Sequence, residues 1–366
     1  MPPGRMSRAR TAMKRRDVLA GATLGASQLL AAPAVGQQAG RHLSLVTDWP
    51  DGPGMMASVR RLAESIRVAT AGRIQIETHP AGTLVRPFEV FDAVEAGVAD
   101  MFHTHAAYYD RKSLALHFFS GLPFGLNSTE IFGWVHVGGG QALFDEVCTP
   151  FGIKPLLATS PGAQMGGWYT KAIRSPDDLH GLRYRMAGIG AEIYRRLGAT
   201  VVLLPASDIV SSLRSGAIDA CEWVGPWLDT IMGLHEAAEY YYYPGWHEPG
   251  AALTLGIATR IWEDLDSADQ KIIEAAAAAE YSTSYAEFGL NNARALRELR
   301  ADGRVRIESF SEDLLARFSV LSTEVIGEIT ATDALAARIA ESYYAYHLLA
   351  RDWHGVAEGA LANGAR

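Results

Sequence analysis

Apolar positions along the chain follow two spacings in turn, one typical of strands and one typical of helices. Short apolar runs at residues 43–46 and 74–77 predict strands, and the spacing of three to four positions across 56–70 predicts an amphipathic helix between them. A further helix is predicted at 88–96 and a further strand at 100–103. Strands that alternate with helices in this way predict an α/β sandwich.

A stretch of the first half of the chain is echoed in the second half. Residues 94–100 read Val-Glu-Ala-Gly-Val-Ala-Asp, and residues 213–219 read Leu-Arg-Ser-Gly-Ala-Ile-Asp. Both indicate a helix that ends at a glycine and is followed by a strand. The two stretches lie much farther apart than solenoid repeats of roughly 20 to 50 residues, so they favour two similar lobes around a shared cleft, with chance similarity as the alternative.

The region around the second echo continues the alternation. Ser175 and the Pro-Asp-Asp that follows it are typical of a helix start, because a hydroxyl caps the first turn and acids favour its positive end. Strands are predicted at 182–186 and 200–204, and helices at 191–197 and 208–215. This half therefore has the elements of a second α/β lobe.

The C-terminal part of the chain is predicted to be mostly helical. Ser267 and Gln270 have the spacing of a capping box ahead of a helical pattern that reaches about residue 300. A helix of that length cannot be buried in one lobe, so we expect it to run across the back of both. A short strand is predicted at 305–308, and helices from 312 onward.

Length supports this division, since 366 residues exceed what one hydrophobic core usually serves. The predicted parts are an export signal at 1–34, a first lobe at 41–162 and 251–285, a second lobe at 163–250 and 286–318, and C-terminal helices at 319–366. The aromatic residues within 343–347 would lie in the core or pack against a second subunit, and we favour the core.

The first residues have the pattern of an export signal. Six basic residues precede an uncharged, Ala- and Leu-rich run at 18–34, which ends in the small-x-small sequence that signal peptidases cut. The pair Arg15 and Arg16 resembles a twin-arginine signal. The apolar run is shorter than the roughly 20 residues that a bilayer requires, so a removed signal is favoured over a membrane anchor. We expect the mature protein in the periplasm.

Charge and cysteine content narrow the function. The formal net charge of −8 becomes more negative without the basic leader, so nucleic acid is not an expected partner. Cys148 and Cys221 are the only cysteines, which excludes a disulfide scaffold; two buried free thiols are favoured over one bridge.

Motifs of the common enzyme classes are missing from the sequence. His235-Glu236 lacks the second histidine of a zinc-protease helix, and no Gly-x-Ser-x-Gly sequence occurs. His103 and His105 are two positions apart in a strand-like run, and nothing fixes them as a metal pair, so each is expected to form hydrogen bonds in the core or cleft. We do not expect an enzyme.

Three charged residues stand among aromatic and apolar neighbours, where charge is costly: Arg185, Glu222 and Glu248. Such groups are typical of a ligand-binding cleft, although structural ion pairs also occur in these surroundings.

Residues 181–186, Gly-Leu-Arg-Tyr-Arg-Met, resemble the signature strand of the solute receptors of TRAP transporters (tripartite ATP-independent periplasmic). Further blocks point to the 2-oxoacid- and lactate-binding subgroup: Ala-Tyr-Tyr at 107–109, Leu-Pro-Phe-Gly at 122–125, Gly-Ala-Gln-Met-Gly-Gly-Trp at 162–168, Asp-Ala-Cys-Glu-Trp-Val-Gly-Pro at 219–226, and Tyr-Tyr-Tyr-Pro-Gly-Trp at 241–246. The resemblance implies a two-lobed, type II-like periplasmic binding protein fold with a long spine helix and a C-terminal helical extension.

The resemblance also implies roles for single residues. Arg185 would bind the substrate carboxylate by paired hydrogen bonds. A metal ion that touches the substrate would be held by Gln164, Glu222, Glu248 and the backbone carbonyl of Trp223. These all-oxygen ligands suit Na⁺ or Ca²⁺ better than zinc.

Other residues would complete the substrate site. The Tyr108 hydroxyl would contact the 2-oxo or 2-hydroxy oxygen, and Phe124 and Trp223 would form apolar walls. His247 departs from the aromatic residue expected between Trp246 and Glu248, which leaves the identity of the acid open.

The charges of the site favour Ca²⁺. A divalent cation neutralises two glutamates and one substrate carboxylate when Arg185 is counted, whereas a monovalent cation leaves one negative charge. Helix dipoles or nearby donors can offset that charge, so Na⁺ stays open.

The sequence therefore predicts a receptor that binds a small organic acid and delivers it to TRAP membrane subunits. A homodimer through the C-terminal helices is a further expectation. The alternatives are a metal-dependent periplasmic enzyme that acts on a small organic acid, with Glu222 or Glu248 as general base, and a ligand-sensing partner of a membrane receptor.

Overall fold

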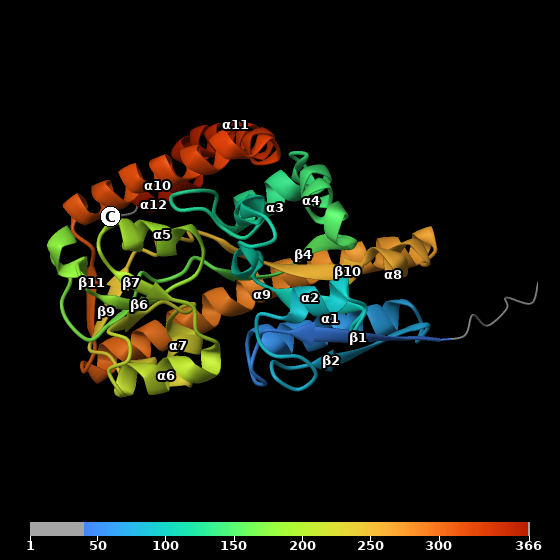
Figure 1. The fold of residues 1–366 in the computed structure, drawn as a ribbon, viewed down its shortest axis with the longest axis horizontal. Helices are drawn as coiled ribbons and strands as arrows, with labels where there is room; N and C mark the ends of the chain where they lie inside the picture. The colour runs from blue at the N-terminus through green and yellow to red at the C-terminus, as the bar shows by residue number, and fades with distance from the viewer. Residues whose placement is uncertain (1–39, 365–366) are drawn as a thin grey trace, which may run out of the picture. The chain divides into compact units, whose positions relative to one another are not determined.

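The computed structural model describes residues 40–364, and these residues hold two separate β-sheets with helices packed around them (Figure 1). The predicted export signal, 1–34, lies outside the described residues. No helix in the described part of the chain is both long and apolar enough to cross a membrane.

The first sheet has five strands in the order β2-β1-β3-β10-β4. Its strands are β1 (Arg41–Thr47), β2 (Ile74–His79), β3 (Met101–Thr104), β4 (Ile153–Gly162) and β10 (Ala251–Ala258). β1, β2 and β3 are parallel, and β10 is antiparallel to both of its neighbours. Helices α1 (Met55–Ala69) and α2 (Val90–Glu95) connect the parallel strands, as the apolar spacing predicts.

The second sheet has six strands in the order β11-β9-β5-β8-β6-β7. Its strands are β5 (Gly167–Tyr169), β6 (Arg183–Arg185), β7 (Thr200–Val202), β8 (Ala220–Cys221), β9 (Tyr240–Tyr243) and β11 (Arg306–Ser309). β6 is parallel to β7 and β8. Helix α5 (Gly188–Arg196) connects β6 to β7, and helix α6 (Ala206–Arg214) connects β7 to β8. The predicted α/β alternation is confirmed in this half too.

The echoed stretches have equivalent places in the two sheets. α2 is followed by Gly97 with φ 77° and then by β3, and α6 is followed by Gly216 with φ 70° and then by β8. Both glycines adopt the left-handed conformation that ends a helix at little cost. The predicted order of helix, glycine and strand is confirmed at both places.

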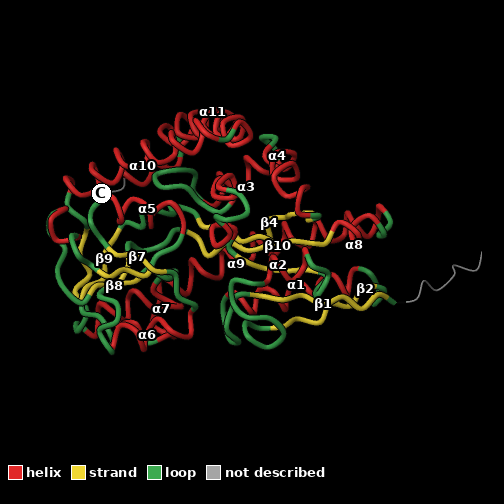
Figure 2. Tube along the Cα trace, viewed as in Figure 1, coloured by secondary structure: helices red, strands yellow, loops and turns green. Residues whose placement is uncertain are grey.

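Within residues 40–364 the chain passes between the two sheets three times. Two passages are short segments, 163–166 and 244–250, and the third runs through α9 (Ser267–Asp302), which contacts β4 and α1 of the first lobe and α7 (Pro226–Met232) of the second (Figure 2). The predicted spine helix is confirmed. The exact lobe bounds given by the sequence stay a prediction.

Two predicted helix starts differ in detail from the structure. The cap of α9 is Asp266, whose carboxylate accepts a hydrogen bond from the Asp269 backbone at 2.8 Å, so Ser267 is the first helical residue instead of the cap. Gln270 donates to the Trp262 carbonyl instead of closing a capping box. The start at Ser175 leads only into a short 3₁₀ helix, Pro176–Leu179.

The C-terminal helices extend over both lobes. They are α10 (Glu312–Thr332), α11 (Ala334–Val356) and α12 (Glu358–Gly364). α10 packs on α5 of the second lobe, and α11 packs on α3 (Ser128–His136) and α4 (Gly140–Cys148) of the first. Tyr343 is fully buried, and its hydroxyl accepts a hydrogen bond from the Leu126 backbone at 2.7 Å, so the core interpretation is confirmed for this residue.

The two cysteines of the chain do not form a disulfide bond in the structure. Cys148 ends α4, Cys221 ends β8, and both are buried and free. The sequence-based preference for two free thiols is confirmed.

Candidate ligand-binding site

Parallel pairing of β6 and β8 brings two of the predicted site residues to the same edge of the second sheet. Arg185 is the last residue of β6 and pairs in register with Cys221, the last residue of β8, so Glu222 emerges beside Arg185. The carboxyl ends of parallel strands are where α/β proteins commonly place their ligand sites.

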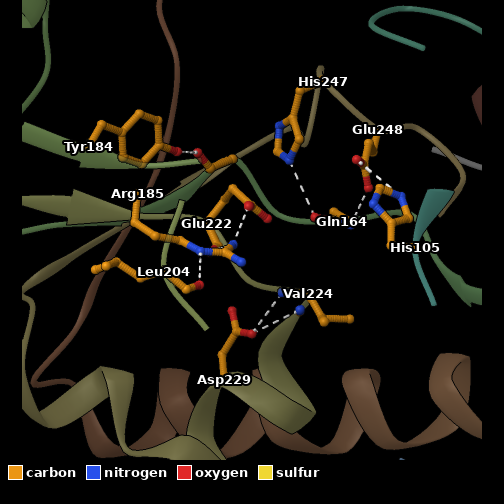
Figure 3. A network of polar contacts seen from close by, with 12 residues as sticks. His105, Gln164, Tyr184, Arg185, Leu204, Glu222, Val224, Asp229, His247 and Glu248 are labelled. Carbon is orange, nitrogen blue, oxygen red and sulfur yellow. Dashed lines mark hydrogen bonds and ion pairs between the residues drawn. The ribbon is translucent and has the colours of Figure 1, made fainter. Parts of the chain in front are cut away.

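The Arg185 guanidinium is buried and nearly surrounded by acceptors (Figure 3). Its Nη1 donates to the Glu222 carboxylate and, at 2.9 Å, to the Glu222 carbonyl, and its Nε donates to the Leu204 carbonyl at 3.1 Å. The Trp223 ring lies 5.4 Å from the guanidinium carbon. Nη2 is buried without a hydrogen-bond partner, and such a donor favours the arrival of an acceptor.

The first lobe also contributes residues to the site from the carboxyl ends of its parallel strands. Trp49 follows β1, and His105 and Tyr108 follow β3, which is parallel to β1. These three residues, together with Glu222 and Trp223 of the second lobe, line one cavity of about 20 Å³. Tyr108 stands in the short 3₁₀ helix Ala106–Tyr109. Burial raises the pKa of its hydroxyl, and the Arg185 charge acts in the opposite direction.

The two short crossing segments supply the remaining polar groups. Gln164 and Glu248 both line the cavity, and the amide nitrogen of the Gln164 side chain donates to the Glu248 carboxylate. The backbones also meet, since Gln164 N donates to the Glu248 carbonyl at 3.3 Å. A Cβ at Gly245 would lie 2.2 Å from the Gln164 carbonyl oxygen, so the close approach of the two segments requires glycine there.

The two buried carboxyl groups of the site have pKa values above those of exposed glutamates. Burial raises the pKa of Glu222 to about 7, although Arg185 opposes the shift. Burial, followed by the Glu222 charge, raises the pKa of Glu248 well above its usual value. Two buried carboxyl groups with raised pKa values create a place where added positive charge is stabilising.

The ligand chemistry fits a hard cation. Glu222, Glu248 and Gln164 offer carboxylate and amide oxygens around the cavity, which are the donors that Ca²⁺ and Na⁺ accept. Among residues 40–364 no group of three or more His, Cys, Asp or Glu side chains is arranged to hold a metal. A cation here would therefore need the amide, or a backbone carbonyl such as that of Trp223, to complete its shell.

Asp229 supports this site from below. Its buried carboxylate accepts hydrogen bonds from Trp168 at 2.9 Å and Tyr241 at 2.7 Å, and from the backbones of Val224 at 3.1 Å and Gly225 at 3.0 Å. Burial raises the pKa of Asp229 to about 6. These bonds fix the segment that carries Trp223.

Phe124 is the predicted site residue that the structure places elsewhere. It does not line the cavity; its ring stacks on Trp246 with centroids 5.7 Å apart and is 37% exposed. Its backbone has φ 55° and donates to the Trp246 carbonyl at 2.8 Å, which sets this direction of the side chain.

His105 and Trp49 line the cavity but are not among the site residues predicted from the sequence. His105 Nε2 lies 3.4 Å from a Glu248 carboxylate oxygen, and burial lowers the pKa of His105 to about 3, so the ring is neutral. His103 is instead a core residue: it accepts from Trp49 Nε1 at 2.7 Å and bonds Thr159 at 3.0 Å. The position directly after a parallel strand is the sequence signal that could have separated the two histidines.

Comparison with known proteins decides the family. The sequence profile of the bacterial extracellular solute-binding proteins, family 7, matches residues 45–333. The chain belongs to this family. The family consists of the solute-binding receptors of TRAP transporters, so this member is a receptor and not an enzyme.

Relatives of this family 7 receptor have known ligands. It is 35% identical over 96% of its length to a monocarboxylate 2-oxoacid-binding periplasmic protein of Nostoc sp. strain PCC 7120, of which it covers 98%. Its fold matches a TRAP solute-binding protein of Bordetella bronchiseptica, a dimer with calcium and picolinate in one active site (TM-score 0.87, 32% identity, 89% of this chain and 97% of the other).

Two further structures contain pyruvate. The receptor of Colwellia psychrerythraea holds calcium and pyruvate (TM-score 0.86, 30% identity, 89% of this chain and 99% of the other). That of Pseudoalteromonas atlantica holds sodium and pyruvate (TM-score 0.85, 29% identity, 88% of this chain and 99% of the other). The family 7 fold of this chain, with its two lobes and spine helix, is therefore the predicted one.

Proposed function

We propose that this chain is the periplasmic receptor of a TRAP transporter for a small monocarboxylate, either a 2-oxoacid such as pyruvate or a 2-hydroxyacid such as lactate. The observation that carries the proposal is the buried Arg185, whose Nη2 has no partner and which lies beside Glu222 and Trp223 at the cavity. A planar guanidinium binds a carboxylate through two parallel hydrogen bonds. The 2-oxoacid-binding relative and the pyruvate-bound structures support this substrate class.

The same proposal includes a cation. Glu222, Glu248, Gln164 and the Trp223 carbonyl would hold Ca²⁺ or Na⁺ next to the acid, and the raised pKa values of the two glutamates favour added positive charge. When bound, the cation supplies a positive charge that attracts the carboxylate and the 2-oxygen of the acid. Ca²⁺ neutralises the site more completely than Na⁺.

Binding would work as a clamp between the lobes. Tyr108 comes from the first lobe and Arg185 from the second, so an acid that contacts both stabilises the closed arrangement by its additional contacts. We further propose that the closed receptor passes the acid to the membrane subunits of the transporter, after export to the periplasm under the signal at 1–34.

A homodimer through the C-terminal helices completes the proposal. The second half of α11 exposes four large apolar side chains, Leu348, Leu349, Trp353 and Val356, each more than 60% accessible. Beside them a groove of about 620 Å³ between α10 and α11 is lined by Ile326, Ala340 and Tyr344. Exposed apolar surface of this kind is typical of protein contacts, and the Bordetella relative is a dimer.

A thermal-shift experiment tests substrate and cation together. Metal-stripped protein is heated with pyruvate, 2-oxobutyrate or lactate, each with and without Na⁺ or Ca²⁺. We expect one acid to raise the melting temperature only when one of the cations is present, because a ligand that binds the folded state stabilises it. A folded protein that no acid and cation stabilise together contradicts the proposed substrate class.

A further inference from the structure

The Trp49 ring forms a wall of the proposed acid site. It lines the cavity together with Tyr108, and the centroids of the two rings are 6.3 Å apart. The ring is 2% exposed, and it also lines a second cavity of about 60 Å³ together with Trp223 and Leu228 of the second lobe. Because the acid cavity itself has a volume of only about 20 Å³, a rotation of so large a ring would obstruct it. The site therefore requires Trp49 in one orientation.

The indole N–H of Trp49 begins a series of buried hydrogen bonds that leads away from the cavity. It donates to His103 Nδ1 at 2.7 Å, and His103 Nε2 lies 3.0 Å from the Thr159 hydroxyl oxygen. The hydroxyl oxygens of Thr159 and Ser58 are 2.7 Å apart, and Ser58 donates to a Glu280 carboxylate oxygen at 2.6 Å. The four residues after the indole come from β3, β4, α1 and the spine helix α9. All four are buried, and none of them lines the cavity.

Both ends of this hydrogen-bond series have a fixed direction. The indole N–H can only donate, so His103 Nδ1 accepts. Burial lowers the pKa of His103 to about 3, so the ring is neutral and its proton is on Nε2, which donates to Thr159. At the other end, Arg61 donates to both carboxylate oxygens of Glu280, at 2.7 and 3.2 Å, and Glu280 accepts from Ser58. The Thr159 hydroxyl therefore donates to Ser58, and every link has one donor and one acceptor.

We propose that His103, Thr159 and Ser58 are positioning residues for the acid site. Bonded in series to Glu280 of the spine helix, they hold the Trp49 ring in the orientation that leaves the cavity open, without touching the acid themselves. The inference rests on the proposed function, because it concerns the same acid. It also connects the ligand site by hydrogen bonds to the helix that contacts both lobes.

The Thr159 hydroxyl is the link whose loss is easiest to isolate. Valine has the same shape without the hydroxyl, so in Thr159→Val the His103 Nε2 proton would be buried without an acceptor. The imidazole is then free to turn toward another acceptor, which releases the Trp49 indole. An acid would have to immobilise this additional side chain on binding, a cost that corresponds to about three- to tenfold in affinity. Serine keeps the hydroxyl, so Thr159→Ser should preserve the series.

The first test is a calorimetric titration of the full mature chain with pyruvate, 2-oxobutyrate and lactate in turn, each in saturating Ca²⁺ or Na⁺. For an acid that wild type binds, we expect Thr159→Val to lower the affinity by about three- to tenfold and Thr159→Ser to stay within about twofold. Equal affinity of wild type and folded Thr159→Val overturns the inference.

Thr70→Val is the matched control for this titration. The buried Thr70 hydroxyl also has hydrogen-bond partners, the Ile66 carbonyl at 2.8 Å and the Ile74 backbone N–H at 3.2 Å, but it lies outside the series that leads to Trp49. This variant also loses a buried hydroxyl, so its melting temperature should fall as that of Thr159→Val does, while its affinity for the acid stays that of wild type.

The second test observes the Trp49 indole proton directly. The eight tryptophans give eight indole signals in protein labelled with ¹⁵N at tryptophan, and Trp49→Phe assigns the one required. We expect the Trp49 proton of wild type to exchange with solvent much more slowly than that of Trp353, which is 69% exposed. The Trp49 signal should move in Thr159→Val and stay in place in Thr159→Ser and Thr70→Val. Fast exchange in wild type, or an unmoved signal in folded Thr159→Val, overturns the inference.

The two proposals fail in different ways. If wild-type protein binds none of the three acids with either cation, the proposed function and the role of the hydrogen-bond series are both contradicted. If wild type binds an acid, but folded Thr159→Val binds it equally well, only the role of the series is contradicted.

Discussion

At the scale of single residues, burial and hydrogen bonding suit Arg185 to its proposed role. The guanidinium is held by Glu222 and by the Leu204 carbonyl, and these contacts fix its plane before any ligand arrives. A group that is already oriented loses little freedom on binding, which strengthens the interaction with a carboxylate. Charge alone would not be enough, because a lysine at this position lacks the fork of parallel donors.

Arg185→Lys tests that argument without leaving Glu222 unpaired. The lysine keeps a positive charge beside the buried glutamate, but it cannot form two parallel hydrogen bonds to the acid. We expect affinity for the acid to fall by about 10- to 100-fold, measured by calorimetry in saturating cation.

Arg183 provides the matched control two positions earlier in the same strand. It is exposed and paired with Asp219 at 2.6 Å, so Arg183→Lys should leave affinity unchanged. Equal affinity of wild type and Arg185→Lys would remove Arg185 from the carboxylate site.

Asp48 sets a pH dependence of stability. Burial raises its pKa to about 6, against hydrogen bonds from Thr104, the Phe88 backbone and Tyr109. The folded state therefore holds this proton more tightly than the unfolded chain, and the free energy of unfolding falls as the pH rises from about 4 through 6. Between pH 4.5 and 7.5 we expect the free energy of unfolding of wild type to fall by about 2 kcal/mol more than that of Asp48→Asn.

Denaturant unfolding at a series of pH values measures this difference. The exposed Asp51, which pairs with Arg60 on the surface, gives the control variant Asp51→Asn. Parallel pH profiles for wild type and Asp48→Asn would contradict the assignment.

The candidate site residues that stand out chemically could be singled out from the sequence. Arg185, Glu222 and Glu248 are charges among apolar neighbours, and the structure gathers them around one cavity or directly beside it. Gln164 and Tyr108 have no such contrast and were found only through the family resemblance. Trp49 carries no charge that stands out, and its position after the parallel strand β1 is the one sequence feature that indicates its place in the cavity.

At the scale of elements, the corner between α10 and α11 connects the lobes a further time. Asp333 caps α11 by accepting hydrogen bonds from the backbones of Leu335 at 2.8 Å and Ala336 at 3.1 Å. Because α10 packs on the second lobe and α11 on the first, movement of the lobes has to be accommodated at this corner. The exposed apolar end of α11 lies beyond it.

A charge on that exposed end tests the proposed homodimer. We expect Trp353→Glu to convert a dimer into a monomer in light-scattering measurements after size exclusion, because a buried carboxylate at an apolar contact is strongly unfavourable. Val68→Glu, at an equally exposed position on α1, should leave the mass unchanged. A wild-type monomer at all concentrations would contradict the dimer.

Element types were more predictable than element ends. The long helix, the parallel strands and the C-terminal helices follow from apolar spacing, which depends on many residues at once. The start of α9 depends on a single choice between Asp266 and Ser267, which are both good caps. The direction of Phe124 depends on one backbone angle, and no sequence spacing records it.

At the scale of the whole described unit, the proposed polar site and the two short crossing segments use the same residues. Gln164, His247 and Glu248 lie on the two short crossing segments, so ligands bound there act directly where the lobes are joined. A contact at a hinge restricts the movement of both lobes at once. In the proposed clamp, this placement would link occupancy of the site to the closed arrangement without a separate relay.

Neither sheet is made from one continuous stretch of chain, and this governs the order of folding during synthesis. One edge of β3 pairs with β10, and one edge of β9 pairs with β11. Both partner strands lie much later in the sequence and are therefore synthesised later. A nascent chain that ends before residue 251 leaves an edge of β3 unpaired, and such edges promote aggregation. We therefore expect the two sheets to be completed only after β10 and β11 have been synthesised, and we expect pairings this distant in sequence to slow folding.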